Sequence, residues 1–295
     1  MYDFKNLYEP ASVLEALKLK KEHPEALILA GGSDILIKIR EGKLAGCDLI
    51  SIYPLDELRG ICMEDDGAIL IRPLSSFTDV LMHPVIKQHI PVLGEALEQI
   101  GGPQIRNIGT IGGNICNGVT SADSAGTLKA YDAVLEISSL EGTRVLPFRD
   151  FNISPGKVDL RPGEILTGIR IPKESYENTY GHFIKYAMRK AMDIATLSCS
   201  VNVRLTENKK NIDRLRIAFG VAAPVPIRSF TAEERANGQP IDEKLLDLIA
   251  EGALQDVKPR TSWRASKEFR LHLVEELARR ATVESIERAG GKING

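Results

Sequence analysis

A run of small residues follows an apolar segment near the N-terminus. In LILAGGSDIL, residues 27–36, a predicted strand runs into Gly31, Gly32, Ser33 and Asp34. Glycines let the backbone approach a ligand closely, so that successive N–H groups can hold phosphate oxygens, and the serine hydroxyl adds a donor. The same residues could also form an ordinary turn with a helix cap. Their spacing fits neither the G-x-G-x-x-G nor the P-loop pattern.

A second, longer glycine-rich stretch is GGPQIRNIGTIGGNICNGVTSAD, residues 101–123. Its polar side chains supply neutral hydrogen-bonding groups at Thr110, Asn114, Asn117 and Ser121. Asp123 could accept hydrogen bonds from sugar hydroxyls. We predict a long glycine-rich loop over 101–126, and a loop of this length inside a compact domain is usually functional. The segment therefore indicates a cradle for a diphosphate.

Charged residues recur every four positions in FIKYAMRKAMDIA, residues 183–195, at Lys185, Arg189 and Asp193. On a helix this spacing is simply a charged face with ion pairs between turns, so the pattern alone leaves a functional role open.

A basic stretch with one aromatic residue lies near the C-terminus. Its members are Arg260, Trp263, Arg264 and Arg270. No wider basic field surrounds them, so they indicate a partner interface or a helix surface rather than nucleic-acid binding.

Cysteines and histidines are too scattered to form a metal centre. Four cysteines stand at positions 47, 62, 116 and 199, and the five histidines show no H-E-x-x-H spacing. We therefore expect no disulfide framework, no metal site and no iron–sulfur cluster in this chain. There is also no His-acid-Ser arrangement, so we expect no catalytic residues. Redox chemistry would need an organic cofactor or a metal held by a partner.

The bulk properties describe a protein with no charge-based affinity for polyanions. Lys and Arg total 38 and Asp and Glu total 40, a net charge of −2, so neither nucleic acid nor an anionic membrane is an expected partner. The first residues lack the apolar core of a signal peptide, and no run approaches the roughly 18 apolar residues of a membrane helix. We expect a cytoplasmic protein of two or three domains.

Hydrophobic patterning places these segments in an α+β chain. A helix over 11–23, a strand at 26–30 and a strand at 47–52 predict a compact α/β unit over residues 1–53. The next segments are expected to form a strand at 68–73, helices broken by prolines over 77–100, and strands of an antiparallel or mixed sheet in 134–172. Strands at 182–188, 194–205 and 215–222 then precede helices from about 231 onward, the last ending at Gly290 and Gly291.

The two glycine segments together resemble the FAD-binding domain of molybdopterin-dependent dehydrogenases. AGGSDIL near residue 30 is followed about 80 residues later by TIGGNI and a downstream Asp. The resemblance continues through GEILTGIRIP, FIKYAMRKAMDIA, IAFGVAAPVPIR and SWRASKEFRLHL, and so covers essentially the whole chain. The form of residues 102–125 is similar to the separate FAD subunit of bacterial xanthine dehydrogenases.

The resemblance implies a fold and a set of flavin contacts. It implies an FAD-binding domain over 1–175, with subdomains of about 1–56 and 57–175, and a C-terminal α+β domain over 176–295 with antiparallel strands and helices. The implied cofactor-binding residues are Ile28, Leu29, Ala30, Gly31, Gly32, Ser33, Asp34 and Ile35 in the first loop, Thr110, Ile111, Gly112, Gly113, Asn114 and Asn117 in the second, and Ile100, Asp123, Leu166, Lys185 and Ile194 elsewhere. Asp123 would hold ribityl or ribose hydroxyls, Ile100 and Ile194 would pack near the isoalloxazine ring, and Leu166 would meet its polar edge through the backbone.

The resemblance further implies an electron-transfer subunit of xanthine dehydrogenase. A large subunit with the molybdenum cofactor would hydroxylate a purine, a small subunit would relay electrons through [2Fe-2S] clusters, and FAD in this chain would pass them to NAD+. A dimer of heterotrimers is implied. Three alternatives stay open: a related molybdenum hydroxylase acting on an N-heterocycle, an aldehyde or CO; a stand-alone flavin oxidase or reductase; and a non-enzymatic nucleotide-binding or scaffold protein.

Overall fold

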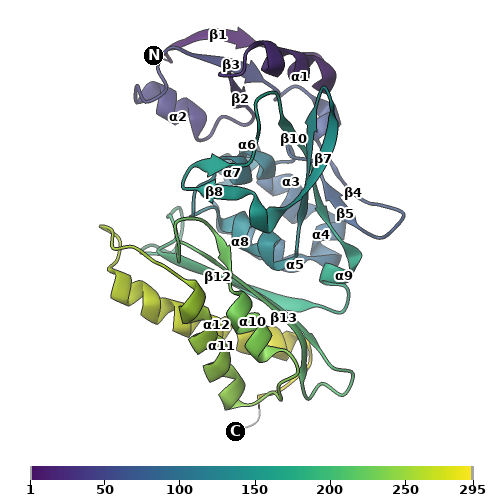
Figure 1. The fold of residues 1–295 in the computed structure, drawn as a ribbon, viewed down its shortest axis with the longest axis vertical. Coiled ribbons are helices and arrows are strands. Elements are labelled where there is room, and N and C mark those ends of the chain that lie inside the picture. Colours follow the sequence, from purple (N-terminus) through teal and green to yellow (C-terminus); the bar gives the residue numbers. More distant parts are fainter. Residues whose placement is uncertain (1, 294–295) are drawn as a thin grey trace.

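The computed structural model describes residues 2–293, and its first unit is a small parallel sheet with two helices (Figure 1). The elements of this unit are β1 (Phe4–Tyr8), α1 (Val13–Glu22), β2 (Leu27–Leu29), α2 (Ile35–Arg40), β3 (Cys47–Ser51) and the short η1 (Asp56–Leu58). The strands are parallel in the order β1-β3-β2. The predicted helix and both predicted strands of this region are confirmed. Strand β1 was not predicted, because four of its five residues are exposed and its sequence shows no buried apolar pattern.

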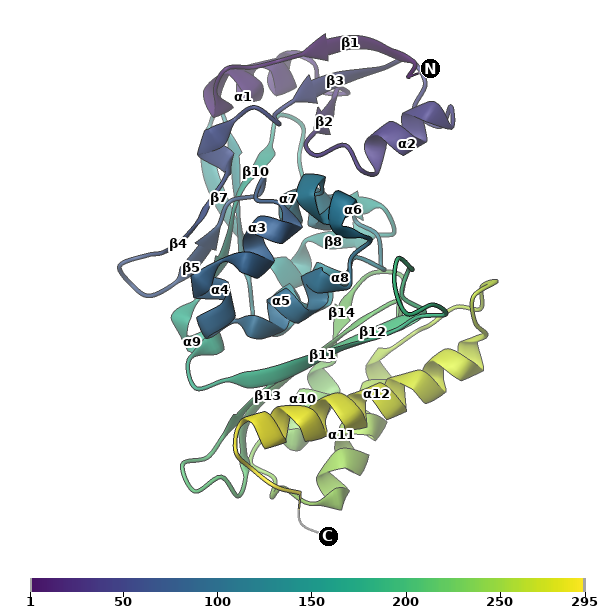
Figure 2. The same cartoon turned by 180° about the vertical axis from the view of Figure 1, so that it is seen from behind.

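The central unit is a five-stranded antiparallel sheet packed against helices (Figures 1 and 2). Its main elements are β4 (Ile61–Met63), β5 (Ile69–Ile71), α3 (Phe77–Met82), α4 (Pro84–His89), α5 (Pro91–Glu98), β6 (Val134–Ser139), β7 (Gly142–Pro147) and β10 (Ile165–Ile171). The strand order is β4-β5-β10-β6-β7. The helix breaks predicted at Pro84 and Pro91 are confirmed, since each proline starts a new helix, where its missing N–H costs nothing.

The prediction of a long loop over 101–126 is wrong. Three helices occupy most of that segment: α6 (Pro103–Ile108), α7 (Ile111–Cys116) and α8 (Asp123–Ala130). Pro103 begins α6 at its first position, and the Thr110 hydroxyl caps α7 by accepting from the Gly113 N–H at 3.1 Å. Each helix has eight residues or fewer, too short for a helical period to stand out among glycines.

A four-stranded antiparallel sheet and three helices form the last unit. They are β11 (Tyr180–Tyr186), β12 (Leu197–Leu205), β13 (Ile212–Gly220), β14 (Ile227–Arg228), α10 (Phe230–Ala236), α11 (Glu243–Asp256) and α12 (Lys267–Arg288). Cys199, Val201 and Val203 of β12 belong to the apolar core shared with the helices. The alternate residues Ser200 and Asn202 are polar yet buried, and α8 of the central unit packs on this sheet.

Smaller elements complete the chain: η2 (Phe148–Asp150), β8 (Asn152–Ser154), β9 (Lys157–Val158) and α9 (Lys173–Tyr176).

The predicted α+β fold class is confirmed. Buried apolar residues fall into three clusters, and we propose that these are the cores of the units predicted at about 1–56, 57–175 and 176–295. Between residues 2 and 293, no helix is long and apolar enough to cross a membrane.

Candidate functional site

The two glycine segments lie against each other. A Cβ atom on Gly31 would stand 1.8 Å from the Ile108 carbonyl oxygen, so the first segment touches the backbone that enters α7. A Cβ on Gly113 would lie 4.0 Å from the Cβ of Ala30. Lys38 of α2 donates to the Asn117 side-chain oxygen at 3.0 Å and fastens the two segments at a further point. Segments about 80 residues apart in sequence thus form one surface.

The first segment turns sharply between a strand and a helix. Ile28 and Leu29 belong to β2, and Ile35 is the first residue of α2. Ala30, Gly31, Gly32, Ser33 and Asp34 form the turn, in which Gly32 has a φ of +71°, a conformation that favours glycine. The Asp34 carboxylate pairs with Lys38 one turn later, at 2.6 Å.

The second segment builds the first turn of α7. Ile111 and Gly112 are buried there, and a Cβ on Gly112 would stand 2.7 Å from the Pro73 carbonyl oxygen, so only glycine fits. The Asn114 side-chain oxygen accepts a hydrogen bond from the Ser124 hydroxyl at 2.6 Å. The helix is thereby fixed between the segment after β5 and α8.

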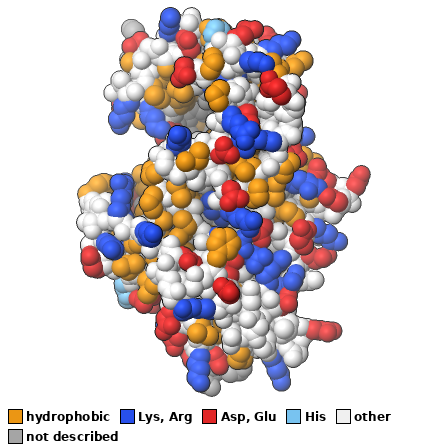
Figure 3. Space-filling view, in the orientation of Figure 1, with side chains coloured by type: hydrophobic (Ala, Val, Ile, Leu, Met, Phe, Trp, Pro, Cys, Tyr) orange, Lys and Arg blue, Asp and Glu red, His pale blue; other side chains and the backbone are white. Residues whose placement is uncertain are grey.

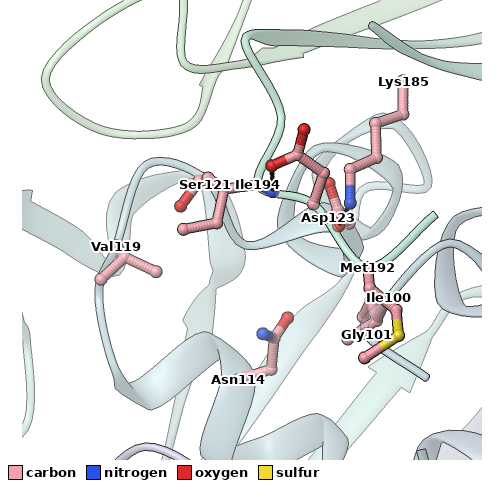
Figure 4. A pocket seen from close by; sticks show the side chains of 10 residues that line it. Ile100, Gly101, Asn114, Val119, Ser121, Asp123, Lys185, Met192 and Ile194 are labelled. Carbon is pink, nitrogen blue, oxygen red and sulfur yellow. Dashed lines mark hydrogen bonds and ion pairs between the residues drawn. The ribbon is translucent and has the colours of Figure 1, made fainter. Parts of the chain in front are cut away.

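A pocket of about 260 Å³ lies between α7, α8 and the loop that follows β11 (Figure 4). Its lining residues are Ile100, Gly101, Asn114, Val119, Ser121, Asp123, Lys185, Met192, Asp193 and Ile194. Five of the predicted cofactor-binding residues are therefore brought together: Ile100, Asn114, Asp123, Lys185 and Ile194. Gly101 and Met192 were not singled out from the sequence, and Met192 carries no pattern that would have marked it.

The other predicted residues lie outside this lining. The first glycine segment contacts the backbone before α7, and Thr110 to Gly113 and Asn117 belong to α7 and its two caps, where Thr110, Ile111 and Gly112 are buried. Leu166 lies in β10 with its side chain in the central core, 4% exposed. A separate hollow of about 370 Å³ at the β12–β13 turn is lined by Thr206, Glu207 and Asn208, and it contains none of the predicted residues.

A buried ion pair closes one wall of the pocket. The Asp123 carboxylate and the Lys185 ammonium lie 2.7 Å apart, and their side chains are only 7% and 6% exposed. Lys185 also donates to the Gln99 carbonyl oxygen at 3.0 Å. The second carboxylate oxygen of Asp123, Oδ1, is buried and has no hydrogen-bond partner. Burial raises the pKa of Asp123 to about 6, although the positive charge of Lys185 acts in the opposite direction.

Helix α8 connects this ion pair to a second one. Every residue from Asp123 to Ala130 is buried, and just beyond the helix Asp132 pairs with Arg216 at 2.9 Å and with Arg228. Arg228 also pairs with the buried Glu233 at 2.5 Å. Both ends of α8 are therefore fixed by charge to strands of the last unit, which holds Asp123 in place at the pocket.

The regular spacing of Lys185, Arg189 and Asp193 does not reflect a helix. Lys185 lies in β11, whereas Arg189 and Asp193 belong to the loop between β11 and β12. The Asp193 carboxylate accepts from the backbone N–H of Arg189 and of Ile194, both at 2.9 Å. The acid therefore shapes the loop that brings Met192 and Ile194 to the pocket.

Comparison with known proteins gives matches over the whole chain. A family model described as the FAD binding domain in molybdopterin dehydrogenase matches residues 2–174, and one described as the CO dehydrogenase flavoprotein C-terminal domain matches residues 182–285. The putative xanthine dehydrogenase FAD-binding subunit of Escherichia coli (strain K12) is 44% identical over 99% of this chain and 100% of that protein. The glyceraldehyde dehydrogenase medium chain of Sulfolobus acidocaldarius is 29% identical over 92% of this chain and 95% of its own.

The fold has a solved counterpart. A chain of the carbon monoxide dehydrogenase from Hydrogenophaga pseudoflava superposes with a TM-score of 0.92 and 27% identity, over 98% of this chain and 99% of that chain. The fold, the paired glycine segments and the full-length matches agree, and the chain belongs to the family of FAD-binding subunits of molybdopterin-dependent dehydrogenases of the xanthine dehydrogenase type.

Proposed function

We propose that this chain is the flavin subunit of a cytoplasmic xanthine dehydrogenase. In the proposed complex it takes electrons from a small [2Fe-2S] subunit, which receives them from a large subunit with the molybdenum cofactor, and it delivers them to NAD+. Two copies of each subunit would form a dimer of heterotrimers. The substrate is taken from the name of the relative that is 44% identical, whereas relatives named for other substrates are less similar, and the partners follow from the family resemblance.

The observation that carries the flavin assignment is the orphaned oxygen of Asp123. A buried carboxylate oxygen without a partner costs free energy unless a ligand supplies a donor, and sugar hydroxyls are suitable donors. Asp123 lines a pocket beside two glycine segments whose backbones can come close to a diphosphate. The residues present therefore fit FAD.

The chain's own residues would bind and orient the cofactor. Residues Ile28 to Ile35 and Thr110 to Asn114, with Asn117, would hold the diphosphate, and Asp123 would accept from hydroxyls of the ribityl or ribose part. Ile100 and Ile194 would pack near the ring, Leu166 would meet its polar edge through the backbone, and Lys185 would fix the Asp123 carboxylate. FAD, when bound, supplies the ability to collect single electrons and release them as a pair. The protein's share is to position the ring and control access to it.

The affinity for FAD should depend on pH through Asp123. The ionised carboxylate is the stronger acceptor, so we expect binding to tighten as the pH rises through about 6. The folded-state pKa lies above the ordinary 3.8, so the folded chain holds this proton more tightly, and the stability contributed by Asp123 falls as the pH rises from 3.8 to about 6. Titration of the apo chain with FAD at several pH values checks this. If the FAD affinity of Asp123→Asn depended on pH in the same way as that of the wild type, the role assigned to Asp123 would be contradicted.

A purified complex tests the proposed function. We expect this chain to copurify with a molybdenum subunit and an iron–sulfur subunit, and xanthine to bleach the flavin only in the complex while NAD+ restores its colour. NADH should reduce the flavin of the isolated chain. Reduction of the isolated chain by an organic substrate would instead favour a stand-alone flavin enzyme. A complex inactive on purines but active on an aldehyde or another N-heterocycle would favour a related hydroxylase, and a colourless complex would favour a scaffold.

A further inference from the structure

A buried arginine lies where the last helix begins. Arg270, in α12, is 2% exposed, and its guanidinium donates to the Arg260 carbonyl oxygen at 2.6 Å and to the Ser262 hydroxyl at 2.8 Å. Its Nε is buried and has no acceptor. Both acceptors are neutral, so the positive charge of Arg270 is removed from water without a negative charge to balance it. Burying a positive charge with only neutral acceptors costs free energy, and a negatively charged partner would offset that cost.

The two neighbouring arginines also have no acidic partner. Across residues 2–293, neither Arg260 nor Arg264 nor Arg270 forms a salt bridge, and the Arg264 Nε is also buried without a partner. Burial lowers the pKa of Arg270, and the positive charges of Arg260 and Arg264 lower it further.

The two acids nearest in sequence have other contacts. Asp256 accepts from Ser229 and Thr231, whereas Glu268 is exposed and interacts with Ser266 and Lys267. Neither acid pairs with the arginines, which leaves the cluster open to an anionic group of another molecule.

One exposed aromatic side chain stacks on this cluster, and another lies next to Arg270 in sequence. Trp263 is 78% exposed, and the Arg264 guanidinium stacks 4.1 Å from the centre of its ring. Phe269 meets Tyr186 edge to face, with ring centres 5.8 Å apart. Tryptophan, tyrosine and arginine dominate the binding energy of protein interfaces, and a tryptophan this exposed is rarely left in water. Figure 3 shows basic and apolar side chains side by side along the left edge, where this part of the chain lies.

The surface adjoins the proposed flavin pocket. Tyr186 directly follows Lys185, which lines the pocket, and the loop before α12 runs beside the loop that carries Met192 in both views of the fold (Figures 1 and 2). A partner seated on Trp263 would therefore lie next to the pocket. An electron donor has to approach the flavin closely, whereas a subunit that only supplies substrate does not.

We infer that Trp263 and the cluster of Arg260, Arg264 and Arg270 form the surface on which the iron–sulfur subunit docks, with a carboxylate of that subunit bound by the arginines. The inference rests on the proposed function, because it assumes an iron–sulfur partner. Guanidinium groups bind carboxylates through paired hydrogen bonds, which explains why arginine rather than lysine fills all three positions.

Charge reversal at the cluster tests the inference. With purified iron–sulfur subunit, we expect Arg264→Glu and Arg260→Glu to weaken binding to the FAD-loaded chain by about tenfold or more, and Trp263→Ala to do the same, with unchanged flavin content and melting temperature. Arg280→Glu is the matched control, because it reverses the charge of an exposed arginine in α12, outside the cluster, that pairs only locally with Glu276. Trp263→Ala and Arg260→Glu alter exposed side chains, so they decide the outcome if Arg264→Glu folds poorly.

Fluorescence gives an independent readout, since Trp263 is the one tryptophan of the sequence. Its emission should change when the iron–sulfur subunit binds, relative to a Trp263→Phe chain. Wild-type binding that none of the variants weakens would overturn the inference and leave the proposed function intact. A response of Trp263 to inorganic phosphate or NAD+, lost in Arg264→Glu, would show a small-anion site and also overturn it. If the wild-type chain binds no iron–sulfur subunit at all, the proposed function itself fails.

Discussion

Replacing Asp123 with alanine is expected to yield a nearly colourless protein. The substitution removes the carboxylate proposed to accept from the flavin hydroxyls, and losing a hydrogen bond to a charged group should weaken FAD binding about tenfold to a hundredfold. It also leaves the Lys185 ammonium buried with a neutral carbonyl oxygen as its remaining partner, which is expected to cost about 3–5 kcal/mol of stability. The visible absorbance of the purified chain and an FAD titration measure the first effect, and thermal unfolding measures the second.

A double variant separates these two effects. Asp123→Ala with Lys185→Met removes both charges, so most of the lost stability should return because no ion stays buried alone. Flavin binding should not return, because no carboxylate is present to accept. Full flavin absorbance in either variant would show that Asp123 does not contact the cofactor. Recovery of flavin together with stability would show that Asp123 acts only through folding.

Replacing Gly31 with alanine is expected to separate the two glycine segments. The added methyl group would stand 1.8 Å from the Ile108 carbonyl oxygen and 3.3 Å from the Gly109 Cα, so the backbone itself has to move. Forced overpacking of this kind destabilises proteins by about 1–3 kcal/mol, and the shift would widen the surface proposed to hold the diphosphate. We therefore expect a folded chain of lower melting temperature that loses most of its FAD.

Gly94 provides the matched control for this substitution. It lies in α5, and an added Cβ would have no neighbour within 4 Å. Gly94→Ala should leave flavin content unchanged and stabilise the helix by about 0.5–1 kcal/mol, because alanine loses less conformational freedom. Equal flavin content in Gly31→Ala and wild type would rule out a role of the first segment in binding.

Structure could be predicted from the sequence where a residue type has one dominant effect on the backbone. Glycines marked both segments because they permit close backbone approach, and prolines marked the starts of α4 and α5. The length of structured chain in 101–126 was misjudged because helices of only six to eight residues are too short to show an apolar period. The start of α6 is marked by Pro103 and the start of α7 by the Thr110 cap, whereas α8 has no side-chain cap.

The side-chain contacts around the pocket and α8 could not be predicted from neighbouring residues in the sequence. Asp123 meets Lys185 across 62 residues, and Asp132 meets Arg228 across 96. Nothing in the spacing of either residue indicates its partner, since pairing depends on how α8 lies on the last sheet. The resemblance placed Asp123 and Lys185 near the flavin, whereas their direct pairing and the unpartnered Asp123 oxygen emerged from the structure.

The position of Lys185 has a consequence for how the protein is made. The ribosome releases the glycine segments and Asp123 before it has synthesised the strand that carries the lysine. Domains tend to fold in the order in which they emerge, so the central unit would have its acid in place while one wall of the pocket is still missing. Cofactor uptake is then a late event in the biogenesis of this subunit, completed only after the last sheet has formed against α8.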